Sequence, residues 1–233
     1  RLQSSGNTTG DVSLNNGATG TTNVTFGANG LSTVNGNLTI RNQATTSTRT
    51  TTIGGTTVNG TTGLYLFNVG AGDAVTTIGA SNPVVVLKTL KIEDGTGVST
   101  VDVRTVTLGS INYSDIGGGA DVIDLAGTGG GTVIVNGVVR ISTGGGSDTV
   151  RIGTAGTAIL NDSVFITLAD GDDALTIGDN ASSPSFGSAS KFQFDGGAGV
   201  DVFTGSVLSL ADYEAIKPGK KLKSKITNFE TYN

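Results

Sequence analysis

Pairs of apolar residues, each pair separated by one residue, recur along this chain at intervals close to 26 residues. The first members of successive pairs lie 26, 26, 21, 28, 25 and 28 residues apart. Alternation with a period of two is typical of a strand with one buried face, and a repeat of about 20 to 50 residues is typical of a solenoid. The pairs are Leu38/Ile40, Leu64/Leu66, Leu90/Ile92, Ile111/Tyr113, Val139/Ile141, Val164/Ile166 and Phe192/Phe194.

In several repeats a second apolar pair begins nine or ten residues after the second member of the first pair. A looser third apolar group ends most repeats. Three short strands per unit with glycine-rich corners favour an all-β, right-handed parallel β-helix of about six or seven coils over a sandwich or a propeller. The second pairs are Val101/Val103, Ile123/Leu125, Val150/Ile152 and Leu175/Ile177. The third groups include Val84 to Val86, Val133/Val135, Ile159/Leu160 and Val207/Leu208.

The pattern divides a single domain into three segments. Residues 1–60 are rich in Thr, Asn and Gly and form irregular coils or an assembly segment, whereas residues 61–205 hold the regular coils. From residue 206 the repeat fails, so residues 206–233 are interpreted as a polar C-terminal cap that ends in a strand, ITNFETYN. No apolar run approaches the length of a membrane span.

The amino-acid composition limits the catalytic mechanisms and the partners that are compatible with this chain. The chain has no Cys, His, Met or Trp, which argues against the familiar serine and cysteine hydrolase mechanisms and leaves carboxylate, Lys, Arg and Tyr chemistry. The net charge is −5, with −7 in residues 1–210 and +2 in residues 211–233. Because aromatic residues make up 5% and no basic stripe is interleaved with them, we expect no nucleic-acid partner.

The glycine corners carry a second motif. Gly196 to Thr204 reads GGAGVDVFT, and weaker copies begin at Gly117, Gly144 and Asp170. This stretch resembles the GGxGxDxUx nonapeptide of haemolysin-type (RTX) repeats, which bind Ca²⁺ in a parallel β-roll. The closing ITNFE is similar to the strand that ends repeats in large secreted bacterial surface proteins. RTX nonapeptides follow one another directly, whereas here one copy occurs per coil, so the resemblance does not imply the two-sided calcium cage.

If the coils stack in register, the motif aspartates Asp121, Asp148, Asp173 and Asp201 form a column about 5 Å apart. Their repulsion needs compensation, either from backbone N–H groups of each aspartate's own turn or from a cation such as Ca²⁺ between coils. The best single calcium site would be the turn that holds Asp170, Asp172 and Asp173. The candidate calcium ligands are Asp121, Asp148, Asp170, Asp172, Asp173, Asp195 and Asp201, with Asp124 as a further oxygen donor.

Two further functions are compatible with parts of the sequence. Parallel β-helices include polysaccharide lyases and hydrolases that use grouped carboxylates with Arg or Lys, and the spacing allows Asp124 and Arg151 to be neighbours across coils. Thr-rich stretches at 45–52 and 56–62 suggest ice binding, although Gly and Asn interrupt them. The outward charged candidates for an enzyme are Asp102, Arg104, Asp124, Arg140, Arg151 and Lys191.

The function that these patterns favour is non-enzymatic and structural. We expect an extracellular or cell-surface subunit of a fibre, surface layer or biofilm matrix. It would assemble with copies of itself, head to tail, through solenoid ends or strand addition. The alternative is an adhesin or a module that binds cell-surface glycan. No catalytic residue and no cofactor other than Ca²⁺ is predicted.

Overall fold

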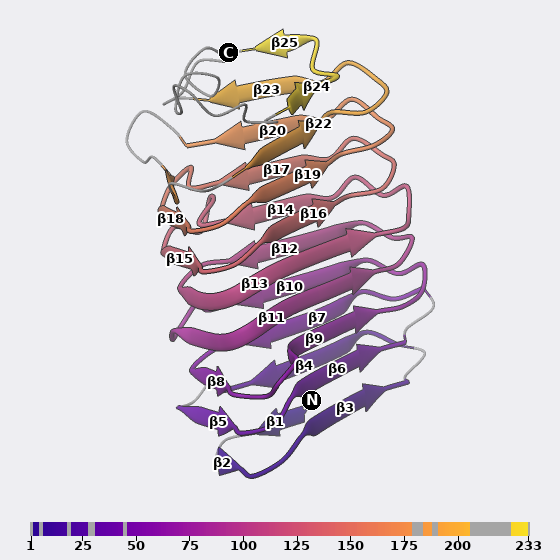
Figure 1. The fold of residues 1–233 in the computed structure, drawn as a ribbon. Coiled ribbons are helices and arrows are strands. Elements are labelled where there is room, and N and C mark those ends of the chain that lie inside the picture. Colours follow the sequence, from indigo (N-terminus) through magenta and orange to yellow (C-terminus); the bar gives the residue numbers. More distant parts are fainter. Residues whose placement is uncertain are drawn as a thin grey trace.

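A computed structural model describes residues 2–4, 7–17, 20–27, 31–43, 46–178, 184–187, 191–205 and 225–232. These residues form a rod of stacked coils in which the paired strands are parallel, and no helix occurs among them (Figure 1). The predicted parallel β-solenoid is therefore confirmed. In the part of the chain described, nothing forms a helix long and apolar enough to cross a membrane.

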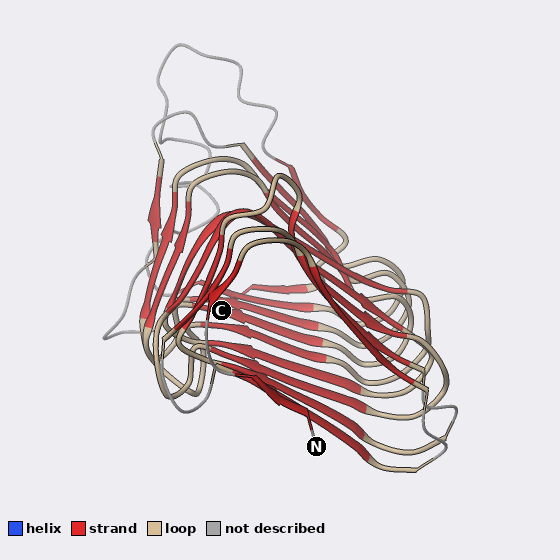
Figure 2. Ribbon diagram, turned by 90° about the horizontal axis from the view of Figure 1, so that it is seen from below, coloured by secondary structure: helices blue, strands red, loops and turns tan. Residues whose placement is uncertain are grey.

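Each coil bends at corners and contributes to three faces, as the view along the rod shows (Figure 2). Face 1 is a sheet of ten strands. Its strands, in spatial order, are β1 (Leu2–Ser4), β4 (Thr22–Phe26), β7 (Arg49–Ile53), β10 (Ala74–Ile78), β12 (Ser99–Val103), β14 (Val122–Leu125), β17 (Thr149–Ile152), β20 (Ala174–Ile177), β23 (Val202–Gly205) and β25 (Thr231–Tyr232).

Faces 2 and 3 are joined into one sheet of fifteen strands, because β11 (Val84–Asp94) and β13 (Val106–Asp115) run through both. Face 2 also holds β3 (Val12–Asn16), β6 (Leu38–Asn42), β9 (Gly63–Asn68), β16 (Val139–Ser142), β19 (Val164–Thr167), β22 (Phe192–Asp195) and β24 (Lys225–Thr227). Face 3 also holds β2 (Asn7–Thr8), β5 (Ser32–Val34), β8 (Thr56–Val58), β15 (Thr132–Val135), β18 (Thr157–Leu160) and β21 (Ser185–Phe186).

The register follows the apolar pairs of the sequence. Leu38 pairs with Leu64, and Leu64 with Leu90. The alignment continues through Ile111, Val139, Val164 and Phe192. These side chains are buried, because alternate residues of each strand point into the core. The third apolar group of one coil differs from the predicted pair Ile159/Leu160. Ala158 and Leu160 are the buried residues of β18, whereas Ile159 is only half-buried.

One residue of the difference in spacing between coils comes from a bulge in β11. Val86 pairs with Leu108 but Thr89 pairs with Ser110, so β11 holds one residue more than β13 at the bend between faces 3 and 2. Extra residues of this kind are β-bulges, which bend a strand. The bulge leaves Leu87 56% exposed beside the exposed Lys88.

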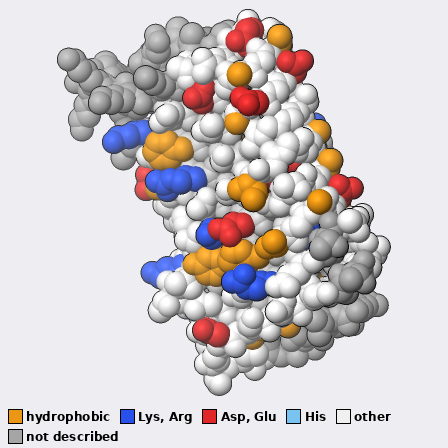
Figure 3. All heavy atoms as spheres, turned by 90° about the vertical axis from the view of Figure 1, so that its right-hand side faces the viewer, with side chains coloured by type: hydrophobic (Ala, Val, Ile, Leu, Met, Phe, Trp, Pro, Cys, Tyr) orange, Lys and Arg blue, Asp and Glu red, His pale blue; other side chains and the backbone are white. Residues whose placement is uncertain are grey.

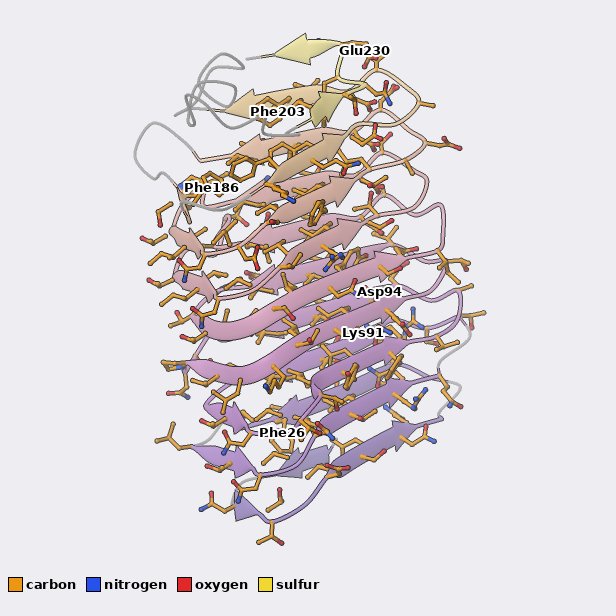
Figure 4. The ribbon with its side chains drawn as sticks, viewed as in Figure 1. Phe26, Lys91, Asp94, Phe186, Phe203 and Glu230 are labelled. Atoms are coloured by element: carbon orange, nitrogen blue, oxygen red, sulfur yellow. The ribbon has the colours of Figure 1, made fainter. Side chains whose placement is uncertain are left out.

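The two ends of the rod differ in their packing. At the C-terminal end the core becomes aromatic, and Phe203 lies 5.7 Å from Phe229 between ring centroids (Figure 4). The predicted final strand is divided by Asn228 into β24 and β25, which continue the ladders of faces 2 and 1. The rest of the predicted cap, residues 206–224, lies outside the described residues, as does the apolar pair Val207/Leu208.

Candidate functional site

The four motif aspartates stack in one column along the rod. Asp121, Asp148, Asp173 and Asp201 immediately precede β14, β17, β20 and β23, which pair in register. Each of these residues is at most 1% exposed. The structure thus shows the stacking predicted from the glycine turns and places the carboxyl groups inside the solenoid.

Hydrogen bonds between coils connect the column. The N–H of Asp121 donates to Asp148 Oδ1 at 2.8 Å, and the N–H of Asp148 donates to Asp173 Oδ1 at 2.7 Å. The N–H of Asp173 donates in turn to Asp201 Oδ1 at 2.8 Å. Each carboxyl group therefore accepts from the preceding coil, which differs from the predicted donation by its own turn.

The same arrangement continues at both ends of the column. Ser99 N–H donates to Asp121 Oδ1 at 2.8 Å, and Asp201 N–H donates to Glu230 Oε2 at 2.7 Å (Figure 4). Glu230 therefore takes the place of a fifth aspartate in the last coil. We call Asp121, Asp148, Asp173, Asp201 and Glu230 the carboxyl ladder.

Close packing of the turns explains the glycines of the motif. Gly171 and Gly199 have φ values of +146° and +152°, which side-chain-bearing residues rarely adopt. A Cβ atom on Gly171 would lie 1.8 Å from Gly146 O, and one on Gly199 would lie 1.7 Å from Gly171 O. The glycine pattern thus has a structural cause in the stacking of consecutive turns, whether or not a cation binds.

Burial raises the pKa of the four ladder aspartates. The pKa of Asp121 rises to about 8, that of Asp173 to about 7 and that of Asp148 to about 6, chiefly because burial disfavours the charged form. The pKa of Asp201 is raised for the same reason. Nearby carboxylates add to the rise, as Asp115 does for Asp121. These four aspartates therefore bind protons in the range where most carboxyl groups are ionised.

In three ladder residues, the surroundings of one carboxyl oxygen favour the protonated form of the group. The Oδ2 atoms of Asp148, Asp173 and Asp201 are buried and have no hydrogen-bond partner among the described residues. An ionised oxygen in this position would be costly, because its solvation is lost without replacement. A proton on Oδ2 removes the charge and leaves Oδ1 free to accept the N–H of the preceding coil.

Other buried polar groups surround the start of the ladder, and the sequence did not identify them. Asn42 Nδ2 donates to Asn68 Oδ1 at 2.9 Å, and Asn68 Nδ2 donates to Asp94 Oδ1 at 2.6 Å. Arg49 is 1% exposed and donates from Nη2 to Gly72 O. Burial lowers the pKa of Arg49 and raises that of Asp94 to about 6.

The remaining calcium candidates are not gathered with the ladder. Asp170 and Asp172 are exposed, although they share a turn with the buried Asp173. Asp172 Oδ1 accepts Val200 N–H at 2.9 Å, and Asp195 Oδ1 accepts Asn228 Nδ2 at 2.7 Å. Within the described ranges, no three acidic side chains are arranged so that they could hold a metal ion.

A calcium titration provides a first test of these residues. We expect millimolar Ca²⁺ to shift the midpoint of thermal unfolding by less than about 2 °C relative to chelator, because the oxygens of the four ladder aspartates already accept hydrogen bonds or are closed off from solvent. Differential scanning calorimetry in the two buffers measures the shift. A concentration-dependent rise of several degrees would instead show that coils separate enough to bind the cation.

The charged residues predicted to point outward are distributed over two faces, although Asp124 is buried, with 4% of it exposed. On face 1, Arg151 Nη1 lies 3.2 Å from Asp124 Oδ1, as the spacing predicted, and Arg104 Nη2 lies 2.7 Å from Asp102 Oδ2. Thr128 donates to Asp124 Oδ2 at 2.7 Å. The other two enzyme candidates, Arg140 and Lys191, lie in or beside strands of face 2. The six candidates therefore do not form one cluster.

No family model, no curated protein and no solved structure matches the chain. The solenoid fold is shown by the structure, and the likeness of the glycine turns to RTX repeats remains an interpretation of the motifs.

Proposed function

We propose that this chain is a non-enzymatic, extracellular structural solenoid that assembles end to end with further copies of itself. The observation that carries the proposal is the packing of its first coil. Val12 and Leu14 of β3 point toward the core but are only half-buried, whereas Leu38 and Ile40, one coil further on, are fully buried. Apolar side chains at this end thus present a surface that another coil would bury.

Backbone groups at the same end support a stacking partner. Among the described residues, β1, β2 and β3 each pair with a strand on one side only. An unpaired strand edge is a template for a further strand, and natural proteins usually block such edges. At the opposite end of the rod, β24 and β25 likewise pair with one described strand each. The end of one copy that holds β24 and β25 can therefore stack on the end of another copy that holds β1, β2 and β3.

Substitutions on β3 test the assembly. We expect the double variant Val12→Lys, Leu14→Lys to remain monomeric under conditions in which the wild-type chain forms filaments, because it places two charges in the stacking surface. Ser13→Lys, Asn15→Lys is the matched control, since its two charges point outward from the same strand. Sedimentation velocity and negative-stain electron microscopy measure the assemblies, and circular dichroism checks the fold.

Two results would contradict the proposal. One is a wild-type chain that stays monomeric at every concentration reached. The other is equal polymerisation of both double variants, which would place the contact elsewhere on the rod.

A further inference from the structure

Face 2 carries two places where an arginine lies over an aromatic ring. Arg41 Cζ is 4.2 Å from the ring centroid of Phe67, and Arg140 Cζ is 5.2 Å from that of Phe165. Tyr65 lies beside Phe67, with 6.1 Å between ring centroids. Figure 3 shows hydrophobic side chains bordered by Lys and Arg at two levels of the rod.

These arginines differ from those of face 1 in their ionic partners. Arg104 and Arg151 are paired with carboxylates, whereas neither Arg41 nor Arg140 lies within 4.0 Å of a carboxylate among the described residues. Contact with a ring holds the guanidinium plane while leaving N–H groups at its edge for an anion. Each guanidinium group can therefore bind a carboxylate or sulfate through two hydrogen bonds.

The distance between the two places sets the size of the ligand. Arg41 is on β6 and Arg140 on β16, which are separated by four coil steps in the ladder of face 2. At roughly 4.8 Å per coil, this separation is about 19 Å. A single small anion cannot reach both arginines, but an extended chain lying along the rod can.

The surface between the arginines is polar rather than basic. Its outward positions include Asn112 and Ser114, which can bond hydroxyl groups. Lys91 is also outward, but it is paired with Glu93. A shallow hollow of about 460 Å³, whose lining includes Tyr65, lies at the bend toward face 3.

We infer that face 2 binds an extended anionic polysaccharide, whose carboxylate or sulfate groups contact Arg41 and Arg140 and whose sugar units lie over the polar surface and the rings between them. A nucleic-acid strand fits this surface less well. Each strand of a DNA duplex carries a phosphate about every 3.4 Å along the axis, which would favour a cation in nearly every coil. The inference does not depend on end-to-end assembly, because it concerns the side of the rod.

The test uses polygalacturonate fractions of defined length as the carboxylate probe and dextran sulfate as the sulfate probe. We expect the double variant Arg41→Gln, Arg140→Gln to bind the probe that the wild type prefers about tenfold more weakly or worse. The matched control is Arg104→Gln, Arg151→Gln, which removes the same charge from face 1 and should change affinity less than about twofold. Circular dichroism confirms that both variants are folded.

Three further measurements separate this site from general attraction of polyanions. Arg41→Lys, Arg140→Lys keeps the charge but not the planar group, and we expect it to lose several-fold in affinity. Fragments too short to span about 19 Å should bind more weakly than longer ones. Uncharged dextran should not bind.

Several outcomes would overturn the inference. They are failure of the wild type to bind either anionic polysaccharide, equal losses in the face 1 and face 2 variants, or tighter binding of single-stranded DNA than of both polysaccharides. The last result would assign the surface to nucleic acid instead. Binding can be measured in monomeric Val12→Lys, Leu14→Lys protein, so failure of assembly and failure of glycan binding are distinguishable.

Discussion

Replacing Asp173 with alanine is expected to lower the free energy of unfolding by about 2 to 3 kcal/mol at about pH 5. The substitution removes the acceptor of the Asp148 N–H, a bond of 2.7 Å in the middle of the rod, and leaves that donor buried. At this pH the carboxyl group of Asp173 is protonated, because its pKa is raised to about 7. The loss therefore measures the hydrogen bond and the packing without a contribution from charge.

Two companion variants make this result interpretable. Asp173→Asn keeps an acceptor at the same place, so we expect its stability to lie within about 0.5 kcal/mol of the wild type at about pH 5. Asp170→Ala alters an exposed carboxylate of the same turn and should have an equally small effect. Urea unfolding followed by circular dichroism measures all three variants. If Asp173→Ala lost no more stability than Asp170→Ala, the ladder bonds would contribute nothing to the fold.

The coil register could be predicted because inward residues alternate with outward ones. Leu64, Leu90 and Ile111 are separated by unequal intervals, yet each begins an apolar pair that must face the core. Insertions at corners change the spacing without moving these pairs. The bulge after Val86 could not be predicted from this alternation, because Leu87 is exposed although it continues an apolar run in the sequence.

The ladder was predictable in position but not in bonding. Stacking of the glycine turns placed Asp121 and Asp148 in one column, but the donor to each carboxyl group lies in a different coil. Rules for local turns consider only donors close in sequence. Asp115 does follow such a rule, because its Oδ1 accepts the N–H of Gly117.

Arg49 shows why the burial of some residues cannot be predicted from the sequence pattern. It lies in the Thr-rich stretch 45–52 that suggested ice binding, yet it is buried and pairs with Ala74, which pairs in turn with Ser99 beside the ladder. A charged residue at an inward position contradicts the expectation of an apolar core. The compensating groups, Asp94 and Gly72 O among them, come from coils further along the rod.

The ladder also predicts how stability depends on pH. We expect the free energy of unfolding to fall by about 2 kcal/mol or more between about pH 5 and pH 8. The pKa values of Asp121, Asp148 and Asp173 are raised to about 8, 6 and 7, above the usual value near 4 of unfolded aspartates. The folded state thus binds more protons than the unfolded state. Its extra stability is complete below about pH 4 and is lost as the pH rises through these folded values.

The titratable groups around the ladder do not reverse the expected fall of the free energy of unfolding with rising pH. Asp115 adjoins Asp121 and has a raised pKa of its own, while Tyr113, whose hydroxyl lies 3.0 Å from Asp121 Oδ2, has its pKa raised further from neutrality. Near Asp173 and Asp201, the negative charge of Asp172 adds to the rise. Arg49 attracts Asp94 rather than a ladder carboxyl. The summed effect therefore retains the sign of the ladder itself.

Urea unfolding across this pH range, in chelator, measures the dependence. The control is the triple variant Asp121→Asn, Asp148→Asn, Asp173→Asn, which keeps the acceptors and removes the titrating groups. We expect its stability to change with pH much less than that of the wild type, and to exceed the wild type at about pH 8, where buried carboxylates repel one another. A wild-type stability that rose with pH, or parallel curves for the two proteins, would show that the carboxyls are ionised and compensated in the folded state. A cation between coils would then become the better explanation of the column, because only an added positive charge could hold several buried carboxylates at this spacing.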